Sequence, residues 1–152
     1  MSEIVVEPSS GTCVLIQCDV INTIENYRQV ENSQAESGGI LIGEYRGEHL
    51  NIVGLTTPSV GDLQSRFRFF RRSKTHQSEA LKAWNSSDKK KTFIGDWHTH
   101  AEDHPSPSSI DTTDWLKKLP KRKMFLIIQG RKSRWYGIWD GANLLRADLS
   151  SE

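Results

Sequence analysis

Residues 95–111 read Gly-Asp-Trp-His-Thr-His-Ala-Glu-Asp-His-Pro-Ser-Pro-Ser-Ser-Ile-Asp. The apolar and aromatic residues that lead into this run favour a strand, in which positions i and i+2 point to the same side. His98 and His100 would therefore converge on one point. After a loop with two prolines, Ser108 is suited to cap a helix. Asp111 would then lie in the first helical turn, facing back toward the histidines.

His98, His100 and Asp111 are thus candidate ligands of one metal ion. Two imidazoles and one carboxylate leave a fourth tetrahedral position for water, which is the ligand count of a catalytic zinc site. The sequence therefore predicts a metal-hydrolase centre with one Zn²⁺ per chain, although the same ligands admit cobalt, iron or manganese. His104 is close enough to be considered as a ligand, but its loop position favours substrate contact or simple exposure. Asp114, three residues after Asp111, could orient a ligand.

Length and composition set the outer limits. The 152 residues predict a single domain over residues 1–152 with a buried core. Lys and Arg total 20 against 19 Asp and Glu, so the net charge of +1 gives no reason to expect a nucleic-acid or membrane partner. The sequence contains no long apolar span and its N-terminus does not resemble a signal peptide, so we expect a cytoplasmic protein. Cys13 and Cys18 should both be reduced thiols.

The order of apolar patterns indicates a mixed β-sheet covered by helices, an α/β fold class. The predicted strands are residues 12–17, 38–45, 49–57, 66–70, 91–100, 123–129, 135–139 and 143–149. The predicted helices are residues 20–30 with Asp19 as the cap, 74–86, and 109–119 before Pro120. In the second helix, Ala80, Leu81 and Trp84 should face inward.

The polar spacing resembles a known motif. His-x-His, then seven residues, Ser, two residues and Asp is the spacing of the JAMM motif in the JAB/MPN metalloprotease superfamily. Residues 95–100 are especially similar to its compact prokaryotic branch. The resemblance covers about residues 12–140 and implies a three-layer α/β/α sandwich with a mixed β-sheet, similar to cytidine deaminases. Ala101 stands where the family commonly has proline, which affects loop shape rather than chemistry.

The resemblance also nominates a general base. In that family a glutamate precedes a glycine-containing apolar strand, and residues 36–43 here read Glu-Ser-Gly-Gly-Ile-Leu-Ile-Gly. Glu36 therefore matches the base better than its neighbours Glu25, Glu31 and Glu44. The family pattern further implies that Ser108 donates a hydrogen bond to the oxyanion, in addition to capping the helix.

These features imply a zinc-dependent peptidase or isopeptidase that cleaves after the C-terminus of a conjugated protein. The resemblance favours the deconjugating peptidases of bacterial antiphage (CBASS) operons. Their substrate is a conjugated cGAS-like nucleotidyltransferase with an extended C-terminal tail, and E1-like and E2-like enzymes act in the same pathway. The alternatives are a JAB hydrolase that processes a ubiquitin-like sulfur-carrier protein or small peptide, and a non-catalytic MPN scaffold.

Residues 66–72, Arg-Phe-Arg-Phe-Phe-Arg-Arg, form the one basic cluster with interleaved aromatic residues. An edge strand with solvated arginines is the simplest interpretation, and nucleic-acid binding is a less favoured one. A third interpretation is that this edge binds the extended tail of a conjugate by β-augmentation.

Overall fold

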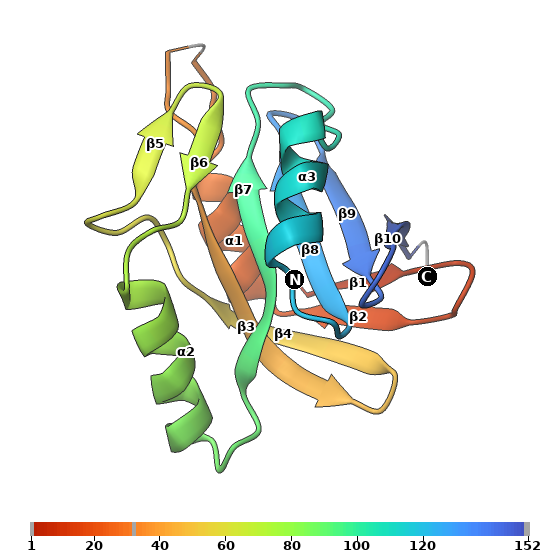
Figure 1. Ribbon diagram of the computed structural model, residues 1–152. Helices are drawn as coiled ribbons and strands as arrows, with labels where there is room; N and C mark the ends of the chain where they lie inside the picture. The colour runs from red at the N-terminus through yellow and green to blue at the C-terminus, as the bar shows by residue number, and fades with distance from the viewer. Residues whose placement is uncertain (1, 32, 151–152) are drawn as a thin grey trace.

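The computed structural model describes residues 2–31 and 33–150 and consists mostly of β-strands (Figure 1). The strands are β1 (Glu3–Val6), β2 (Cys13–Ile16), β3 (Gly38–Arg46), β4 (His49–Leu55), β5 (Leu63–Ser65), β6 (Arg68–Phe70), β7 (Thr92–Thr99), β8 (Met124–Gln129), β9 (Arg134–Trp139) and β10 (Leu144–Leu149). The helices of the described residues are α1 (Cys18–Asn26), α2 (Thr75–Ser86) and α3 (Ser109–Lys118). Among these helices, none is long and apolar enough to cross a membrane.

Eight of the strands close into a barrel in the order β1-β10-β9-β8-β7-β3-β4-β2. The pairs β2–β4 and β7–β8 are parallel, and the other neighbours are antiparallel. The closing strand is β1, in which Val5 pairs with Val14 of β2 on one side and with Leu149 of β10 on the other.

The predicted three-layer α/β/α sandwich is therefore wrong. A sandwich of that kind needs an open sheet with helices over both faces. Here the sheet closes on itself, because Glu3–Val6 supplies a strand that the sequence pattern did not predict. Closure joins β10 to β1. The helices of the described residues are short, at 9, 12 and 10 residues.

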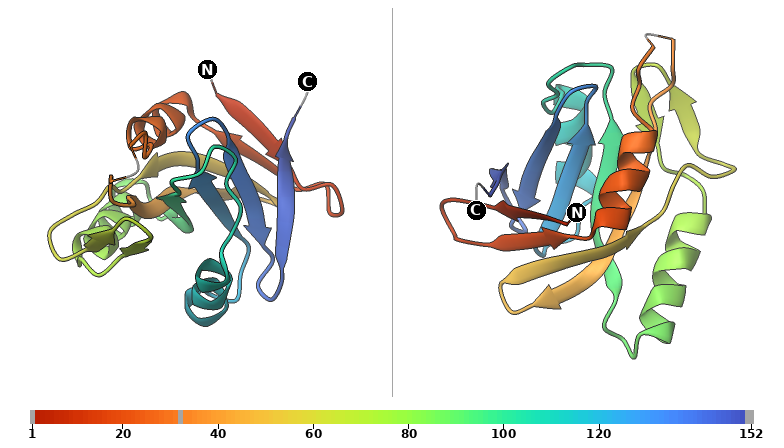
Figure 2. Two further views of the ribbon diagram at one scale, coloured as in Figure 1. Left: turned by 90° about the horizontal axis from the view of Figure 1, so that it is seen from above. Right: turned by 180° about the vertical axis from the view of Figure 1, so that it is seen from behind.

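Two hydrophobic clusters lie on opposite sides of β8. Phe125 and Ile127 face the larger cluster, which also contains the buried face of α1. Alternate residues of the same strand face the smaller cluster, to which α3 contributes Trp115. Figure 2 agrees, since α1 and α3 lie on opposite sides of β7 and β8. Strand β7, which carries the candidate ligand His98, thus lies next to a strand that is buried on both faces.

Most predicted elements are present, with three corrections. The first helix begins at Cys18 with Gln17 as its N-cap, so Asp19 lies in the first turn and is not the cap as predicted. The helix ends at Asn26, and Val30 is exposed. In α2, Leu81 and Trp84 are 58% and 37% exposed, because the buried anchor of this helix is His76, which contacts Asp62 and Thr56 instead. The predicted strand 66–70 is shorter, because residues 66 and 67 form the turn of a hairpin in which β6 pairs with β5. Cys13 and Cys18 are free thiols, as predicted.

Candidate metal centre

Strand β7 carries the two histidines to the start of α3. His98 is the next-to-last residue of β7 and His100 follows the strand, so both rings lie on the same side. The two Nε2 atoms are 3.1 Å apart, and both side chains are mostly buried. Asp111 reaches them from the first turn of α3, with Oδ1 at 3.2 Å from His98 Nε2 and Oδ2 at 3.0 Å from His100 Nε2. The structure thus brings the three candidate ligands together.

Ser108 holds Asp111 in place through a reciprocal cap. The Asp111 N–H donates to Ser108 Oγ at 3.1 Å, and the Ser108 N–H donates to Asp111 Oδ2 at 2.9 Å. This capping box satisfies two backbone donors of α3 and directs the carboxylate toward the histidines. Ser108 is exposed, and its hydroxyl hydrogen takes no part in the cap. Its second predicted role, donation to an oxyanion, stays a prediction.

Glu102 is a site residue that the sequence reasoning did not single out. His100 Nδ1 donates to Glu102 Oε1 at 2.7 Å, so the other ring nitrogen, Nε2, faces the candidate site. Carboxylates in this position fix the tautomer of a metal-binding histidine and raise its basicity. The one available signal was an acidic residue two positions after the second histidine. His104, in contrast, is exposed and contacts Ser133 at 2.9 Å.

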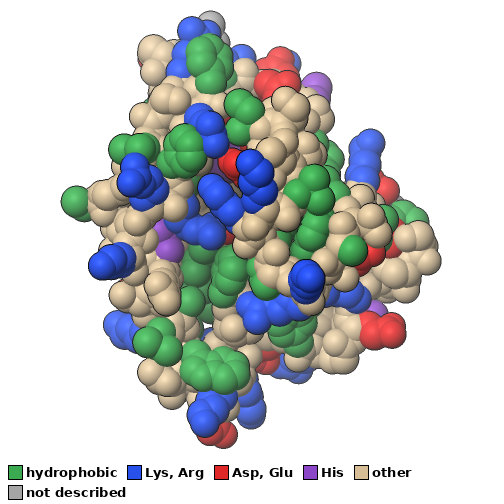
Figure 3. Space-filling view, viewed as in Figure 1, with side chains coloured by type: hydrophobic (Ala, Val, Ile, Leu, Met, Phe, Trp, Pro, Cys, Tyr) green, Lys and Arg blue, Asp and Glu red, His purple; other side chains and the backbone are tan. Residues whose placement is uncertain are grey.

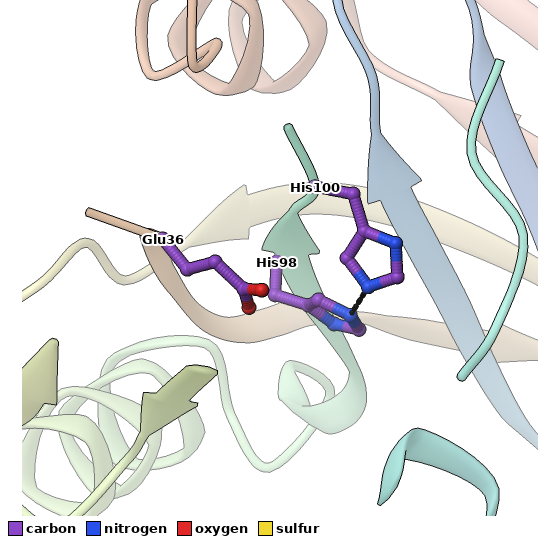
Figure 4. Close-up of side chains that lie close together, drawn as sticks. All are labelled: Glu36, His98 and His100. Atoms are coloured by element: carbon purple, nitrogen blue, oxygen red, sulfur yellow. Dashed lines mark hydrogen bonds between the residues drawn. The ribbon is translucent and has the colours of Figure 1, made fainter. Parts of the chain in front are cut away.

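The carboxylate of Glu36 approaches the same cluster from the segment before β3. Its side chain is buried, and a ligand atom of Glu36 lies within 4.8 Å of those of His98 and His100 (Figure 4). The rival Glu25 contacts Arg134, and Glu44 contacts Arg46. Glu36 is therefore the nominated glutamate that the structure places beside the histidines.

Close packing of glycines shapes this segment. A Cβ at Gly39 would lie 2.1 Å from the carbonyl oxygen of Thr56, and one at Gly38 would lie 2.7 Å from the ring of Phe69. Neither approach is possible for a residue with a side chain. The two glycines thus let β3 begin directly against β4 and the β5–β6 hairpin, with Glu36 just ahead of them.

The environment shifts the pKa values of the two carboxylates, Glu36 and Asp111, in opposite directions. Burial raises the pKa of Glu36 to about 7, against the attraction of His98 and His100. Burial would also raise the pKa of Asp111, but hydrogen bonds from both histidines hold it well below its usual range. Burial alone would lower the pKa of His100, and hydrogen bonds with Asp111 and Glu102 raise it to about 9. Asp111 is thus kept ionised, whereas Glu36 can gain or lose a proton near neutrality.

The donor set fits a tetrahedral metal ion. Ligand atoms about 2.0–2.1 Å from zinc, at two corners of a tetrahedron, are roughly 3.3 Å apart. The two Nε2 atoms are 3.1 Å apart, and each lies near one oxygen of Asp111, that of His98 at 3.2 Å from Oδ1 and that of His100 at 3.0 Å from Oδ2. Two nitrogen donors and one ionised oxygen donor also match the ligand types of a catalytic zinc site. A zinc ion would need little movement of these side chains.

A cleft of about 100 Å³ leads to this cluster between the β5–β6 hairpin and α3. Its walls carry cationic side chains beside apolar ones, as Figure 3 shows for this face of the molecule. The cationic residues are Arg68, Arg71 and Lys118. Asp114, predicted to orient a ligand, instead accepts a hydrogen bond from Arg68 across the cleft at 3.3 Å. The hairpin and the helix that carries Asp111 are thus joined beside the candidate site.

Comparison with known proteins identifies the family. Residues 26–139 match the family described as prokaryotic homologs of the JAB domain. A protein of Vibrio cholerae serotype O1 named "CD-NTase/cGAS isopeptidase" is 38% identical over 136 residues, covering 89% of this chain and 87% of that protein. An Escherichia coli protein of the same name is 36% identical, with 90% and 88% coverage.

A solved structure supports the fold. The solution structure of protein DSY2949 from Desulfitobacterium hafniense superposes with a TM-score of 0.61 at 15% identity. The superposition covers 89% of this chain and 88% of that one. The extent of the family match and the identity to these relatives lead to one conclusion: the chain belongs to the prokaryotic JAB family.

Proposed function

We propose that this chain is a zinc-dependent isopeptidase that cleaves after the C-terminus of a conjugated protein. The observation that carries the proposal is the convergence of His98, His100 and Asp111 with the buried carboxylate of Glu36 beside them. The relatives named for isopeptidase activity support the reaction class. Because the three candidate ligands and the candidate base are all present, we favour an enzyme over a non-catalytic scaffold.

Different side chains would bind the metal, transfer the proton and stabilise the oxyanion during hydrolysis. His98, His100 and Asp111 would hold the metal, which supplies Lewis acidity and lowers the pKa of water from about 15.7 to about 7. Glu36 would accept a proton from the attacking water and give it to the departing amine, whose C–N bond breaks. Ser108 would donate its hydroxyl hydrogen to the oxygen on which negative charge develops. The products are a free carboxylate and a free amine.

The substrate that we propose is a cGAS-like nucleotidyltransferase joined through its C-terminus to a target protein. The names of the relatives at 38% and 36% identity support this choice. Such a conjugate implies E1-like and E2-like enzymes that make it, and a role in bacterial antiphage (CBASS) defence in the cytoplasm. We further propose that residues 1–152 act as one zinc-binding domain, of which residues 1, 32, 151 and 152 lie outside the described part.

The extended tail of the conjugate would lie along the β5–β6 hairpin. Phe67 at its turn is 74% exposed and lines the cleft, together with Arg68. The Nε atom of Arg68 is buried and makes no hydrogen bond to the described residues, so a small movement of this side chain would let it donate to a substrate carbonyl. An Arg66→Glu, Arg68→Glu variant should bind a tail peptide more weakly in calorimetry. The control is Arg72→Glu, Lys74→Glu, and equal affinities of the two variants would count against this path.

The reaction is tested with purified protein and a fusion of a candidate C-terminal tail to a reporter. We expect cleavage directly after the tail, located by mass spectrometry, and its loss when a chelator removes the metal. Cleavage that continues in metal-free protein would contradict the zinc mechanism. Cleavage of a sulfur-carrier fusion but not of the nucleotidyltransferase fusion would leave the chemistry intact and overturn the proposed substrate.

A further inference from the structure

Gln29 is a fully buried side chain that the proposed chemistry does not use. It follows α1 in the chain, and its amide lies between three other segments. Its Oε1 accepts from the Thr99 hydroxyl at 2.8 Å, and its Nε2 donates to the carbonyl oxygens of Gln34 at 3.0 Å and Arg66 at 3.3 Å. A primary amide is needed here, because the same side chain both accepts and donates.

Thr99 links Gln29 to the backbone next to Glu36, the candidate base, through hydrogen bonds on both sides. It lies between the two histidines on β7, so its side chain points to the opposite side of the strand. The Thr99 N–H donates to the Ser37 carbonyl at 2.9 Å, and Thr99 Oγ1 accepts from the Ser37 N–H at 3.0 Å. Because the Thr99 hydroxyl donates to Gln29, its oxygen is oriented to accept from Ser37. Ser37 directly follows Glu36, so this clamp fixes the backbone from which the base extends.

The β5–β6 hairpin is attached to the same backbone. The Glu36 N–H donates to the Ser65 carbonyl at 2.7 Å, and Gln64 Nε2 donates to the Glu36 carbonyl at 3.0 Å. The next residue in the hairpin is Arg66, whose carbonyl accepts from Gln29. One buried amide therefore links the ligand strand, the base segment and one wall of the cleft.

We propose that Gln29 is a positioning residue for the reaction, one that holds Glu36 in register with the metal centre and with the hairpin. The inference rests on the proposed function, since it assigns no chemistry to Gln29 itself. Gln29 acts through Thr99 and Ser37 rather than by touching substrate. A misplacement of a reacting group by about 1 Å can cost as much as roughly 100-fold in rate.

The test compares two buried glutamines in the zinc-loaded protein. Gln29→Met keeps the side-chain volume and removes all three hydrogen bonds, whereas Gln129→Met makes the same change at a buried amide that contacts Gly130 and Arg134. We expect Gln29→Met to lower kcat by about 10- to 100-fold, with a smaller change in KM and unchanged zinc content. Gln129→Met should keep kcat close to that of the unaltered protein.

Hydrogen exchange supplies a readout that does not need a substrate. In Gln29→Met, the amides of residues 36–37 and 64–66 should exchange roughly tenfold faster, while those of β9 stay unchanged. Exchange at these amides equal to that in Gln129→Met would overturn the inference, as would faster exchange with an unaltered kcat. If the unaltered protein cleaves no conjugate, the proposed function fails, and the exchange result still decides whether Gln29 holds the Glu36 segment.

Discussion

The two sides of the candidate metal centre, one with the candidate ligands and one with the candidate base, are built in different ways. The ligand side, residues 98–111, comes from one continuous stretch in which a strand, a loop and a helix cap place three donors within 3.2 Å of one another. The base side joins the segment 29–37, which carries Gln29 and Glu36, to the hairpin 63–70 and to Thr99, which are far from it in the sequence. Local spacing is therefore enough to bring the candidate ligands together, whereas the placement of the candidate base depends on tertiary hydrogen bonds.

The largest effect should come from breaking the ligand side at Asp111. Asp111→Ala removes a candidate ligand and half of the capping box, so we expect no measurable turnover and less than one zinc per chain. Loss of the hydrogen bond from the Ser108 N–H to the Asp111 carboxylate should also lower the free energy of unfolding by about 1 kcal/mol, while the Ser108 cap itself remains. Elemental analysis and chemical denaturation measure the two effects. Asp114→Ala is the control and should keep its zinc; full activity of Asp111→Ala would remove this residue from the site.

Breaking the base side should separate chemistry from metal binding. Glu36→Gln keeps the shape of the side chain but cannot accept the water proton, so kcat should fall by about 10²- to 10⁴-fold. Zinc content should stay at one per chain, because Glu36 is not among the three candidate ligands. The matched control is Glu44→Gln, whose carboxylate contacts Arg46 instead. Undiminished cleavage by Glu36→Gln would exclude Glu36 as the base.

A smaller effect should come from the residue that orients His100. Glu102→Ala removes the acceptor of the His100 Nδ1–H, and losses of this kind commonly weaken metal affinity by about 10- to 100-fold. Turnover at saturating zinc should recover most of its original rate. Competition with a chromophoric chelator measures the affinity, and Asp103→Ala is the neighbouring control. Equal zinc affinities of these two variants would mean that Glu102 does not support the ligand.

The smallest effect concerns a carboxylate remote from both sides. Hydrogen bonds from the Ser9 and Ser10 N–H groups and the Ser9 hydroxyl lower the pKa of Glu7 from 4.5 to about 2. A lowered folded-state pKa stabilises the fold above pH 4.5, and this contribution is lost as the pH falls toward 2. Glu7→Gln should thus be less stable than the unaltered protein at pH 7, with the difference shrinking below pH 4.5. Urea unfolding of the two proteins, each stripped of metal beforehand, checks this at each pH, and a stability difference that widens in acid would contradict it.

The sequence predicts the arrangement of the ligand side better than that of the base side. Two-residue alternation and the Ser108 cap were enough to bring His98, His100 and Asp111 together. The family resemblance nominated Glu36, but no local pattern indicates that Thr99 and Gln29 hold its backbone. The barrel was missed because four residues of β1 are too short to stand out as a strand, and only their pairing with β2 and β10 gives them that role.

The exposed face of α2 illustrates a similar limit. Its apolar residues recur at helical spacing, yet the helix is held by one buried histidine at its N-terminal end. The spacing of Leu81 and Trp84 predicts a helix correctly, but it does not predict which face packs against the sheet. The packed face of α2 depends on the hydrogen bonds of His76 to distant segments, just as the position of Glu36 depends on those of Thr99.

The most direct test is to measure the metal content of native protein prepared without added chelator, together with His98→Ala. We predict one zinc ion per chain in the native protein, none in the variant, and restoration of the native value by added zinc after stripping. Native protein that contains no stoichiometric metal, and that takes up none on reconstitution, would contradict the assignment of this site.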